Sequence, residues 1–343
     1  MTSRMELERD KLVVVTGAGG FIGGHLVGEL RRRGFARVRA VDIKPADRWY
    51  QNHAGVEEIR ADLREADACR DAAAGASTVV NLACDMGGMG FIETHKADCM
   101  ISVLINTHLL MAARDAGAER YLFGSSACVY AADKQTDTDV TALREEDAYP
   151  AMPEDGYGWE KLFGERMCRH FMEDYGLSVR LPRFHNVYGP HGTYDGGREK
   201  APAAICRKVI RAQLDGTNAI EIWGDGGQTR SFTYIDDTVD GILRLLESDV
   251  TEPINIGSSQ LVTINELVDI VEGIAGVKLE RRYKLDAPQG VRGRNSDNAL
   301  VREKLGWEPS TTLETGLAAT YAWIHEQLTT GARDEAALAF QGS

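Results

Sequence analysis

The hydrophobic positions in the first half of the chain form short runs that alternate with longer segments of helical period. Residues 12–16 are an apolar, β-branched run, and glycines lead from it into an apolar-periodic segment over residues 21–33. This pattern is typical of a strand, a tight turn and a helix. Further buried strands are predicted over residues 38–41, 56–60, 78–82, 120–124 and 178–183, and helices around 97–116 and 158–175. Strands that alternate with helices predict the α/β class, with a Rossmann-type doubly wound parallel sheet.

The pattern becomes less regular after residue 183. Short strands are predicted over residues 220–223, 229–234 and 253–256, and helices over 201–214, 236–246, 264–275 and 314–327. We therefore predict that residues 1–183 form most of a main domain, and that residues 184–331 form most of a smaller domain over the carboxyl edge of the sheet. The two domains can exchange segments. Residues 332–343 are expected to form a loose tail.

Composition narrows the classes of partner and compartment. The chain has 343 residues, of which 43% are hydrophobic and 27% charged, as in a globular protein with a large core. Its net charge of −13 disfavours nonspecific binding to nucleic acid or to an anionic membrane, so neither partner is expected. The first ten residues are charged and lack the apolar core of a signal peptide, and no apolar run is long enough to span a bilayer.

The cysteines point to a reducing compartment. Six are present, and none is paired in CxxC spacing. We therefore expect free thiols in the cytoplasm, and neither a disulfide framework nor a metal site.

A glycine motif follows the first predicted strand. Gly17, Gly20 and Gly23 surround Phe21 and Ile22 in a GxxGxxG pattern. The first glycine suits the tight turn, the second lets a pyrophosphate approach the helix N-terminus, and the third lets helix and strand pack closely. A glycine triplet alone is also found in plain loops, but its place between a strand and a helix predicts a dinucleotide site.

Acidic residues extend this site. Asp42 ends the second predicted strand, where an acid binds the ribose 2′-hydroxyl of a dinucleotide and repels a 2′-phosphate. NAD is therefore favoured over NADP, although Lys44 and Arg48 lie nearby and weaken that preference. Asp62 and Leu63, after the third predicted strand, are expected to contact the adenine, and an exposed turn explains them equally well.

Tyr157 and Lys161 are four residues apart, and so lie on one face of the predicted helix. A nearby ammonium favours a phenolate, so we expect the pKa of the tyrosine to be lowered toward that of a general base. A tyrosinate can accept a hydroxyl proton as hydride leaves for a nicotinamide. Ser125 or Ser126 can hydrogen-bond the same oxygen. YxxxK alone also fits an ordinary amphipathic helix, but with the glycine motif it indicates dehydrogenase chemistry on an alcohol.

These motifs make the chain resemble the extended short-chain dehydrogenase/reductase family of sugar-nucleotide enzymes, from about residue 12 to residue 327. A narrower resemblance, to the GDP-mannose 3,5-epimerases, rests on longer strings. They are residues 83–92 (ACDMGGMGFI), 125–130 (SSACVY), 183–190 (RFHNVYGP), 196–204 (GGREKAPAA) and 290–298 (GVRGRNSDN). The first of these resembles the family's glycine-rich sugar loop, which includes Gly88 and Met89.

The resemblance implies an isomerase with NAD as cofactor and GDP-mannose or a related nucleotide sugar as substrate. NAD would oxidise C4 of the mannosyl ring with Tyr157 as base, and the ketone would acidify the hydrogens at C3 and C5. Cys128 and Lys200 match the family's acid/base pair, and each needs a lowered pKa. Read without this context, Cys128 is a small buried hydrophobe and Lys200 belongs to an exposed charged turn.

The resemblance also implies substrate contacts and an assembly. Asn186, Glu199 and Lys208 match substrate contacts of the family. Arg292 and Arg294 are candidates for the diphosphate, because guanidinium groups bind phosphate bidentately. Gln228 and Arg230 are candidates for the nucleotide pocket. Surface placement is the alternative for each. A homodimer is expected, through helices around 97–116 and 158–175.

Two other functions remain open. An NAD-dependent 4-epimerase or 4,6-dehydratase of another nucleotide sugar would keep Tyr157 and Lys161 but leave Cys128 and Lys200 without roles. A catalytically silent NAD-binding subunit would use the same fold. Within the epimerase reading, the product is GDP-L-galactose if both carbons invert and GDP-L-gulose if only C5 does.

Overall fold

The main sheet of the protein is parallel and carries the site at one edge. The structure is a computed structural model that describes residues 6–341, with side chains as far as residue 330. Strand order is β12-β7-β5-β4-β1-β2-β3, and β6 extends the sheet beside β7. The strands are β1 (Leu12–Thr16), β2 (Arg37–Asp42), β3 (Glu57–Arg60), β4 (Thr78–Asn81), β5 (Arg120–Phe123), β6 (Ser125–Ser126), β7 (Ser178–Phe184) and β12 (Pro253–Ile256). The predicted Rossmann-type α/β fold is confirmed.

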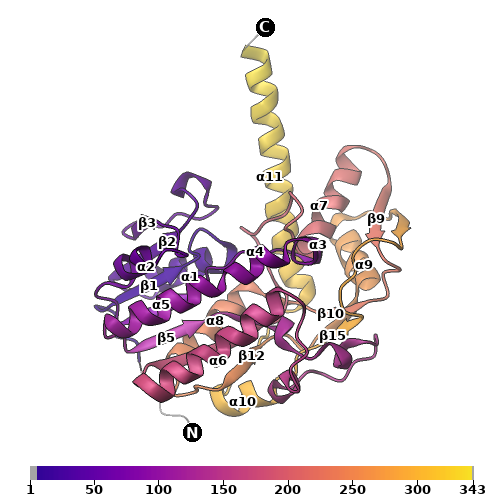
Figure 1. Ribbon diagram of the computed structural model, residues 1–343. Coiled ribbons are helices and arrows are strands. Elements are labelled where there is room, and N and C mark those ends of the chain that lie inside the picture. The colour runs from indigo at the N-terminus through magenta and orange to yellow at the C-terminus, as the bar shows by residue number, and fades with distance from the viewer. Residues whose placement is uncertain (1–5, 342–343) are drawn as a thin grey trace.

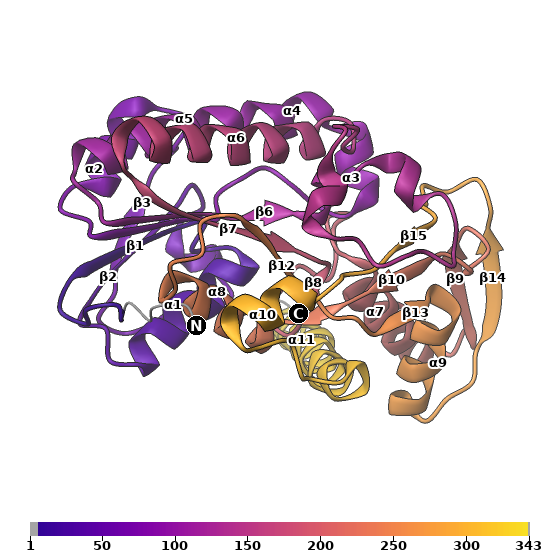
Figure 2. The same ribbon diagram turned by 90° about the horizontal axis from the view of Figure 1, so that it is seen from below.

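Helices cover both faces of this sheet (Figure 1; Figure 2). One face carries α2 (Ala66–Ala73), α4 (Lys96–Ile101), α5 (Val103–Asp115) and α6 (Tyr157–Tyr175). The other carries α1 (Phe21–Arg32) and α8 (Ile235–Leu246). Helices on both faces leave the carboxyl ends of the central strands open, and the polar residues of the site lie there.

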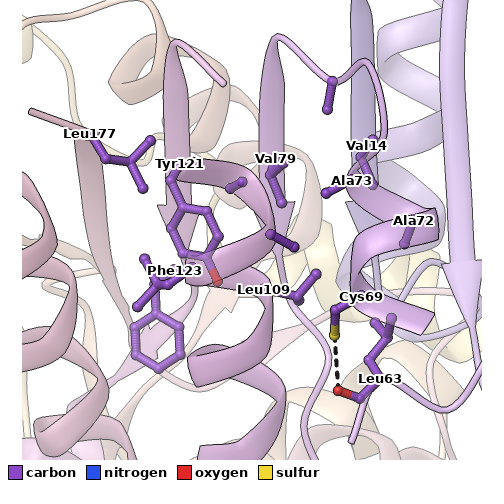
Figure 3. Close-up of a cluster of buried hydrophobic side chains, with 14 of the residues drawn as sticks. Val14, Leu63, Cys69, Ala72, Ala73, Val79, Leu109, Tyr121, Phe123 and Leu177 are labelled. Atoms are coloured by element: carbon purple, nitrogen blue, oxygen red, sulfur yellow. Dashed lines mark hydrogen bonds between the residues drawn. The ribbon is translucent and has the colours of Figure 1, made fainter. Parts of the chain in front are cut away.

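Alternate residues of each strand fill two separate cores. Val14 points into the core beneath α2 and α5, where it meets Val79 and Tyr121 (Figure 3). In that core the Cys69 thiol donates to the Leu63 carbonyl oxygen at 3.1 Å. Val13 and Val15 point the other way, toward α1 and α8. Burial on both faces explains why these strands read as unbroken apolar runs.

The smaller domain packs helices against short strands around a core of its own. Its helices are α7 (Ala201–Leu214), α9 (Ile264–Ala275) and α11 (Leu313–Gln341). Its strand groups are β9 (Ala219–Trp223) with β14 (Glu280–Lys284), and β10 (Thr229–Ser231) with β13 (Leu261–Thr263) and β15 (Gly293–Arg294). The remaining elements are β8 (Val187–Tyr188), β11 (Thr233–Tyr234), α3 (Met89–Thr94), α10 (Ala299–Leu305), and the 3-10 turns η1 (Ala46–Arg48), η2 (Ala127–Val129), η3 (Ala132–Gln135) and η4 (Glu145–Ala148).

Several boundaries differ from the sequence prediction. β12 pairs with β7 and α8 packs on α1, so both belong to the main domain although they lie beyond residue 183. The helix predicted over 97–116 is divided into α4 and α5 at Ser102, whose hydroxyl accepts a hydrogen bond from the Asp85 N–H at 2.9 Å. α11 runs as far as Gln341 and so includes most of the segment for which a loose tail is predicted, and residues 342 and 343 lie outside the described part.

None of the helices within residues 6–341 combines the length and apolar character that a bilayer crossing requires.

One fully buried histidine makes the stability of the fold depend on pH. His185, just after β7, has one ring nitrogen 2.8 Å from the Asn255 side-chain oxygen. Its other ring nitrogen has no hydrogen-bond partner among the described residues. Burial lowers the pKa of His185 from 6.5 to about 3, which keeps the ring neutral.

We predict that His185 stabilises the fold above pH 6.5, and that this contribution is lost as pH falls toward 3. The reason is that the unfolded chain binds a proton in this window and the folded protein does not. The slope from this one group is about 1.4 kcal/mol per pH unit. Urea unfolding at a series of pH values measures it. The destabilisation caused by His185→Gln should shrink as pH falls through this window. A destabilisation that stays constant between pH 6.5 and pH 3 would contradict the prediction.

Candidate active site

Most of the predicted cofactor and catalytic residues line one cavity at the carboxyl edge of the main sheet, whereas Cys128 and Lys161 are not among its lining residues. Its volume is about 770 Å³. Its lining includes Gly17, Gly20, Phe21, Ile22, Gly23, Asp42, Asp62, Leu63, Ser125, Ser126, Tyr157 and Lys200. Segments far apart in the chain therefore meet there, as the carboxyl ends of parallel strands require.

The glycine turn leaves the backbone exposed at the start of α1. Gly17 has φ of +69°, and a side chain there would also approach the Leu82 carbonyl carbon to 2.8 Å. A Cβ on Gly23 would collide with the Gly17 carbonyl oxygen. The turn therefore forms a cradle that only a small backbone allows, beside the unpaired N–H groups of the first helical turn. Such a cradle suits a pyrophosphate.

Asp42 and Asp62 frame the other end of the dinucleotide site. The Asp42 carboxylate accepts the backbone N–H of Gly19 and that of Lys44, both at 2.9 Å, which fixes it beside the glycine turn. Asp62 accepts the backbone N–H of Arg64 at 3.0 Å and pairs with the Arg64 guanidinium. The residues fit NAD, with Asp42 placed for a ribose hydroxyl and Asp62 committed to Arg64.

The tyrosine and lysine share the first turns of α6, but their electrostatics differ from the prediction. The Lys161 ammonium lies 5.4 Å from the Tyr157 ring centroid, 4.6 Å from the Phe123 ring centroid and 3.3 Å from the Glu160 carboxylate. Burial would lower the pKa of Lys161, but Cys84 and Glu160 beside it raise it. Burial raises the pKa of Tyr157 well above its ordinary value, so the expected lowering is not present. The lysine charge is partly neutralised by Glu160 and does not dominate at the phenol.

The two serines have different surroundings. The Ser125 hydroxyl donates to Glu165, which in turn pairs with Arg183 at 2.7 Å in the core. The Ser126 hydroxyl accepts the Cys128 N–H at 3.2 Å, and its hydrogen bond opposes the raised pKa of Tyr157. Ser126 is therefore the serine that faces the tyrosine, and Ser125 anchors the strand end.

Cys128 and Lys200 come from distant segments and meet beside the tyrosine. Lys200 lies at the N-terminus of α7, and burial lowers its pKa, as expected, against the opposing influence of Cys128. Cys128 lies in η2, and its sulfur is 3.4 Å from an Arg294 guanidinium nitrogen. The expected lowering of the thiol pKa is not found, because burial, together with Glu154, raises the pKa of Cys128 to about 11 and Arg294 only partly offsets it.

The sugar loop predicted from the sequence packs against the segment that carries Lys200. The Gly88 N–H donates to the Arg198 carbonyl at 3.0 Å, and Met89 begins α3. The Arg198 guanidinium lies 3.7 Å from the Phe91 ring centroid and 2.6 Å from the Asp85 carboxylate. The loop therefore closes one wall of the cavity over the catalytic residues.

The other predicted substrate residues are not among those that line the cavity. They lie on the smaller domain and around the β7–β8 connection, where each has a protein partner. The partners are Ser231 for Asn186 (3.0 Å), Arg207 for Glu199 (2.8 Å), Glu221 for Lys208 (2.8 Å), Trp223 for Gln228 (2.9 Å) and Asp225 for Arg292 (2.7 Å). Arg230 is buried, and burial, together with Arg294, lowers its pKa to about 9. Arg230 and Arg294, on paired strands, thus place two buried guanidinium groups next to each other.

Sequence reasoning missed three residues of the site. Glu154 and Gln135 both contact Arg294, and Cys84 lies beside Lys161. Cys84 carries a usable signal, because it follows the end of β4 at the same sheet edge as Ser125. Gln135 and Glu154 lie in irregular segments, so no periodic pattern marks them.

Comparisons with known proteins agree with this site. The model of the NAD dependent epimerase/dehydratase family matches residues 13–257, and the chain belongs to that family. GDP-mannose 3,5-epimerase 1 of Oryza sativa subsp. japonica is 46% identical over 331 residues, which cover 94% of this chain and 86% of the relative.

Two solved structures show the same fold. MoeE5, in complex with UDP-glucose and NAD, is 34% identical with a TM-score of 0.76, and the match covers 92% of this chain and 99% of MoeE5. UDP-glucose 4-epimerase of Thermotoga maritima, with UDP-glucose, is 25% identical with a TM-score of 0.82, again over 92% of this chain and 99% of the other. The cofactor of this chain is NAD.

We predict that Gly23→Ala abolishes tight NAD binding, because the added methyl group would push the Gly17 carbonyl into the cradle. Gly273→Ala is the matched control, since a Cβ there meets nothing within 4 Å and lies within α9. The control should keep NAD and gain about 0.5–1 kcal/mol of stability. Bound nucleotide is measured by chromatography of the denatured protein. Normal NAD content in Gly23→Ala would contradict the assignment of the glycine turn.

Proposed function

We propose that the protein epimerises GDP-D-mannose at C3, at C5 or at both through a transient 4-keto sugar, giving GDP-L-galactose, GDP-L-gulose or both. The observation that carries this is that Cys128 lies beside both Lys200 and Tyr157: its charge acts on the pKa of each, and it packs in one buried cluster with Tyr157. A 46% identical rice relative bears the name GDP-mannose 3,5-epimerase 1. A 4-epimerase or a 4,6-dehydratase of another nucleotide sugar would have no evident use for this thiol and amine.

The residues of α6 and β6 serve the redox step at C4. NAD, when bound, supplies the hydride acceptor. Tyr157 takes the proton of the C4 hydroxyl and later returns it, and Ser126 hydrogen-bonds the same oxygen. Lys161 holds a positive charge 5.4 Å from the phenol ring centroid, which stabilises the phenolate once it forms.

Cys128 and Lys200 serve the proton transfers at the neighbouring carbons. The C4 ketone lets a base remove the hydrogen from C5 or C3 as a proton, and the electron pair moves into the enolate. An acid on the opposite face then returns a proton to that carbon, which inverts it. A thiol and an amine from different segments can stand on opposite faces. Burial favours the uncharged form of both groups, because it raises the pKa of Cys128 and lowers that of Lys200.

The buried arginines suit the charged end of the substrate. Arg294 and Arg230 lie on adjacent paired strands, β15 and β10, close to Cys128. We propose that they bind the diphosphate, because a dianion relieves the repulsion between two buried guanidinium groups. Arg292 would have to leave Asp225 to contribute.

The test is incubation of the NAD-loaded protein with GDP-mannose in deuterium oxide, followed by proton NMR of the products. We expect deuterium at C5 and at C3, with new sugar isomers. Deuterium at C5 alone would identify a gulose-forming enzyme. No exchange by protein that retains NAD would reject GDP-mannose as the substrate.

We further predict that Cys128→Ala reduces the rate of epimerisation by about 10²–10⁴-fold, the usual contribution of a positioned acid/base group. The matched control is Cys206→Ala, which removes a buried thiol from α7 in the core of the smaller domain. Product formation is followed by chromatography. A loss of activity in the control as large as that in Cys128→Ala would argue that the effect is structural.

We infer that two copies associate through α4, α5 and α6. Exposed apolar side chains cluster there, namely Met100, Leu104, Met111, Trp159 and Phe163, each at least 42% exposed. An apolar hollow beside them is lined by Tyr149, Ala151, Trp159, Leu162, Phe163 and Arg166. A second copy that presents the same helices would bury this surface in a helical bundle.

Phe163→Glu should therefore shift the protein from dimer to monomer in sedimentation experiments, because it places a charge in the centre of the apolar surface. Leu214→Glu, at an exposed apolar position on α7, should leave the dimer intact. A monomeric wild-type protein would reject the inference.

The cysteines support a reducing compartment. All six are free, and five of them are buried. We propose the cytoplasm as the location, where such thiols persist.

A further inference from the structure

Glu154 lies in the loop before α6, and the mechanism above gives it no role. Its N–H donates to the carbonyl of Cys128 at 3.0 Å, so the backbone fixes it beside the reactive thiol. Its side chain is 16% exposed. Neither carboxylate oxygen has a hydrogen-bond partner among the described residues, and both are shielded from solvent. A shielded carboxylate without hydrogen bonds is costly unless a charge offsets it.

The charge that faces this carboxylate belongs to Arg294. One Arg294 nitrogen lies 3.9 Å from the Glu154 carboxylate, and another lies 3.4 Å from the Cys128 sulfur. The third, Nε, donates to the side-chain oxygen of Gln135 at 2.5 Å. One guanidinium therefore connects the carboxylate, the amide and the thiol.

We propose that Glu154 is a positioning residue that holds Cys128 in the thiol form. Its carboxylate is fixed beside Cys128, where it repels a thiolate, and it pairs with the Arg294 cation that would otherwise stabilise one. The proposal rests on the proposed function only in so far as Cys128 is a catalytic group.

Other charged and titratable groups also face Cys128, but they do not supply the negative charge that Glu154 places beside it. Burial is the largest cause that raises the thiol pKa, Glu154 is the next, and Arg294 opposes both. Lys200, Arg230 and Tyr157 each respond to the charge of Cys128 from α7, β10 and α6. Glu154 is the only carboxylate among these groups. Its removal should therefore lower the pKa of Cys128.

The test measures the thiol itself. The alkylation rate of Cys128 by iodoacetamide is followed by peptide mass spectrometry at several mildly alkaline pH values, where the rate is proportional to the thiolate fraction. Glu154→Gln keeps the shape and removes the charge, and should speed alkylation about three- to tenfold, since one pKa unit is tenfold. Glu154→Asp keeps the charge and should restore most of the wild-type rate. Asp155→Asn removes the neighbouring charge, which pairs with Lys96 at 2.7 Å, and should leave the rate unchanged.

A second variant tests the same electrostatic effect on Cys128 with the opposite sign of charge. Arg294→Gln removes the cation and should slow alkylation of Cys128. Cys128→Ser identifies the signal that belongs to this thiol. An unchanged alkylation profile in Glu154→Gln, or an unchanged one in Arg294→Gln, would overturn the proposal. Because alkylation needs no substrate, these outcomes are independent of whether GDP-mannose is epimerised.

Discussion

Burial of the parallel sheet on both faces is the constraint on which the rest of the structure depends. Val13, Val14 and Val15 point alternately into two apolar cores, so the middle of β1 admits no polar side chain. The polar groups of the cofactor and catalytic sites lie at the carboxyl ends of the strands. The glycine turn follows β1, Asp42 ends β2, and Ser125 and Ser126 follow β5. A single edge thus brings the cofactor cradle and the catalytic groups together.

The smaller domain contributes cationic side chains that the sheet edge lacks. α7 supplies Lys200 at its N-terminus, and β10 and β15 supply Arg230 and Arg294. The return of β12 and α8 to the main domain ties the two parts together, because the chain leaves the smaller domain and re-enters it. Cys128 therefore lies where groups from both domains can act on it. We propose that this thiol and the Lys200 amine add a second acid/base pair to the redox site of the family.

Much of this could be predicted from the sequence, because the strands, the glycine turn and the Tyr157–Lys161 spacing are local patterns with a fixed physical meaning. The pKa directions of Tyr157 and Cys128 could not, because they depend on how deeply each group is buried and on which charges face it. The sequence predicts an electrostatic effect of Lys161 on Tyr157 alone, whereas in the structure Lys161 also interacts with Glu160 and Cys84. Glu154 and Gln135 were missed for the same reason, since their relation to Arg294 exists only in three dimensions. The place of β12 in the main sheet likewise depends on a long-range pairing.

We propose that Tyr157, Ser126 and Lys161 carry the redox chemistry at C4. Cys128 and Lys200 carry the proton transfers at C3 and C5. The most direct measurement uses the double variant Cys128→Ala/Lys200→Met, loaded with NAD and mixed with GDP-mannose in deuterium oxide. We predict that, in this double variant, the absorbance of reduced nicotinamide rises and the recovered sugar carries no deuterium at C3 or C5. Deuterated epimers formed at the wild-type rate would contradict the account, as would the absence of any redox change in a variant that still binds both ligands.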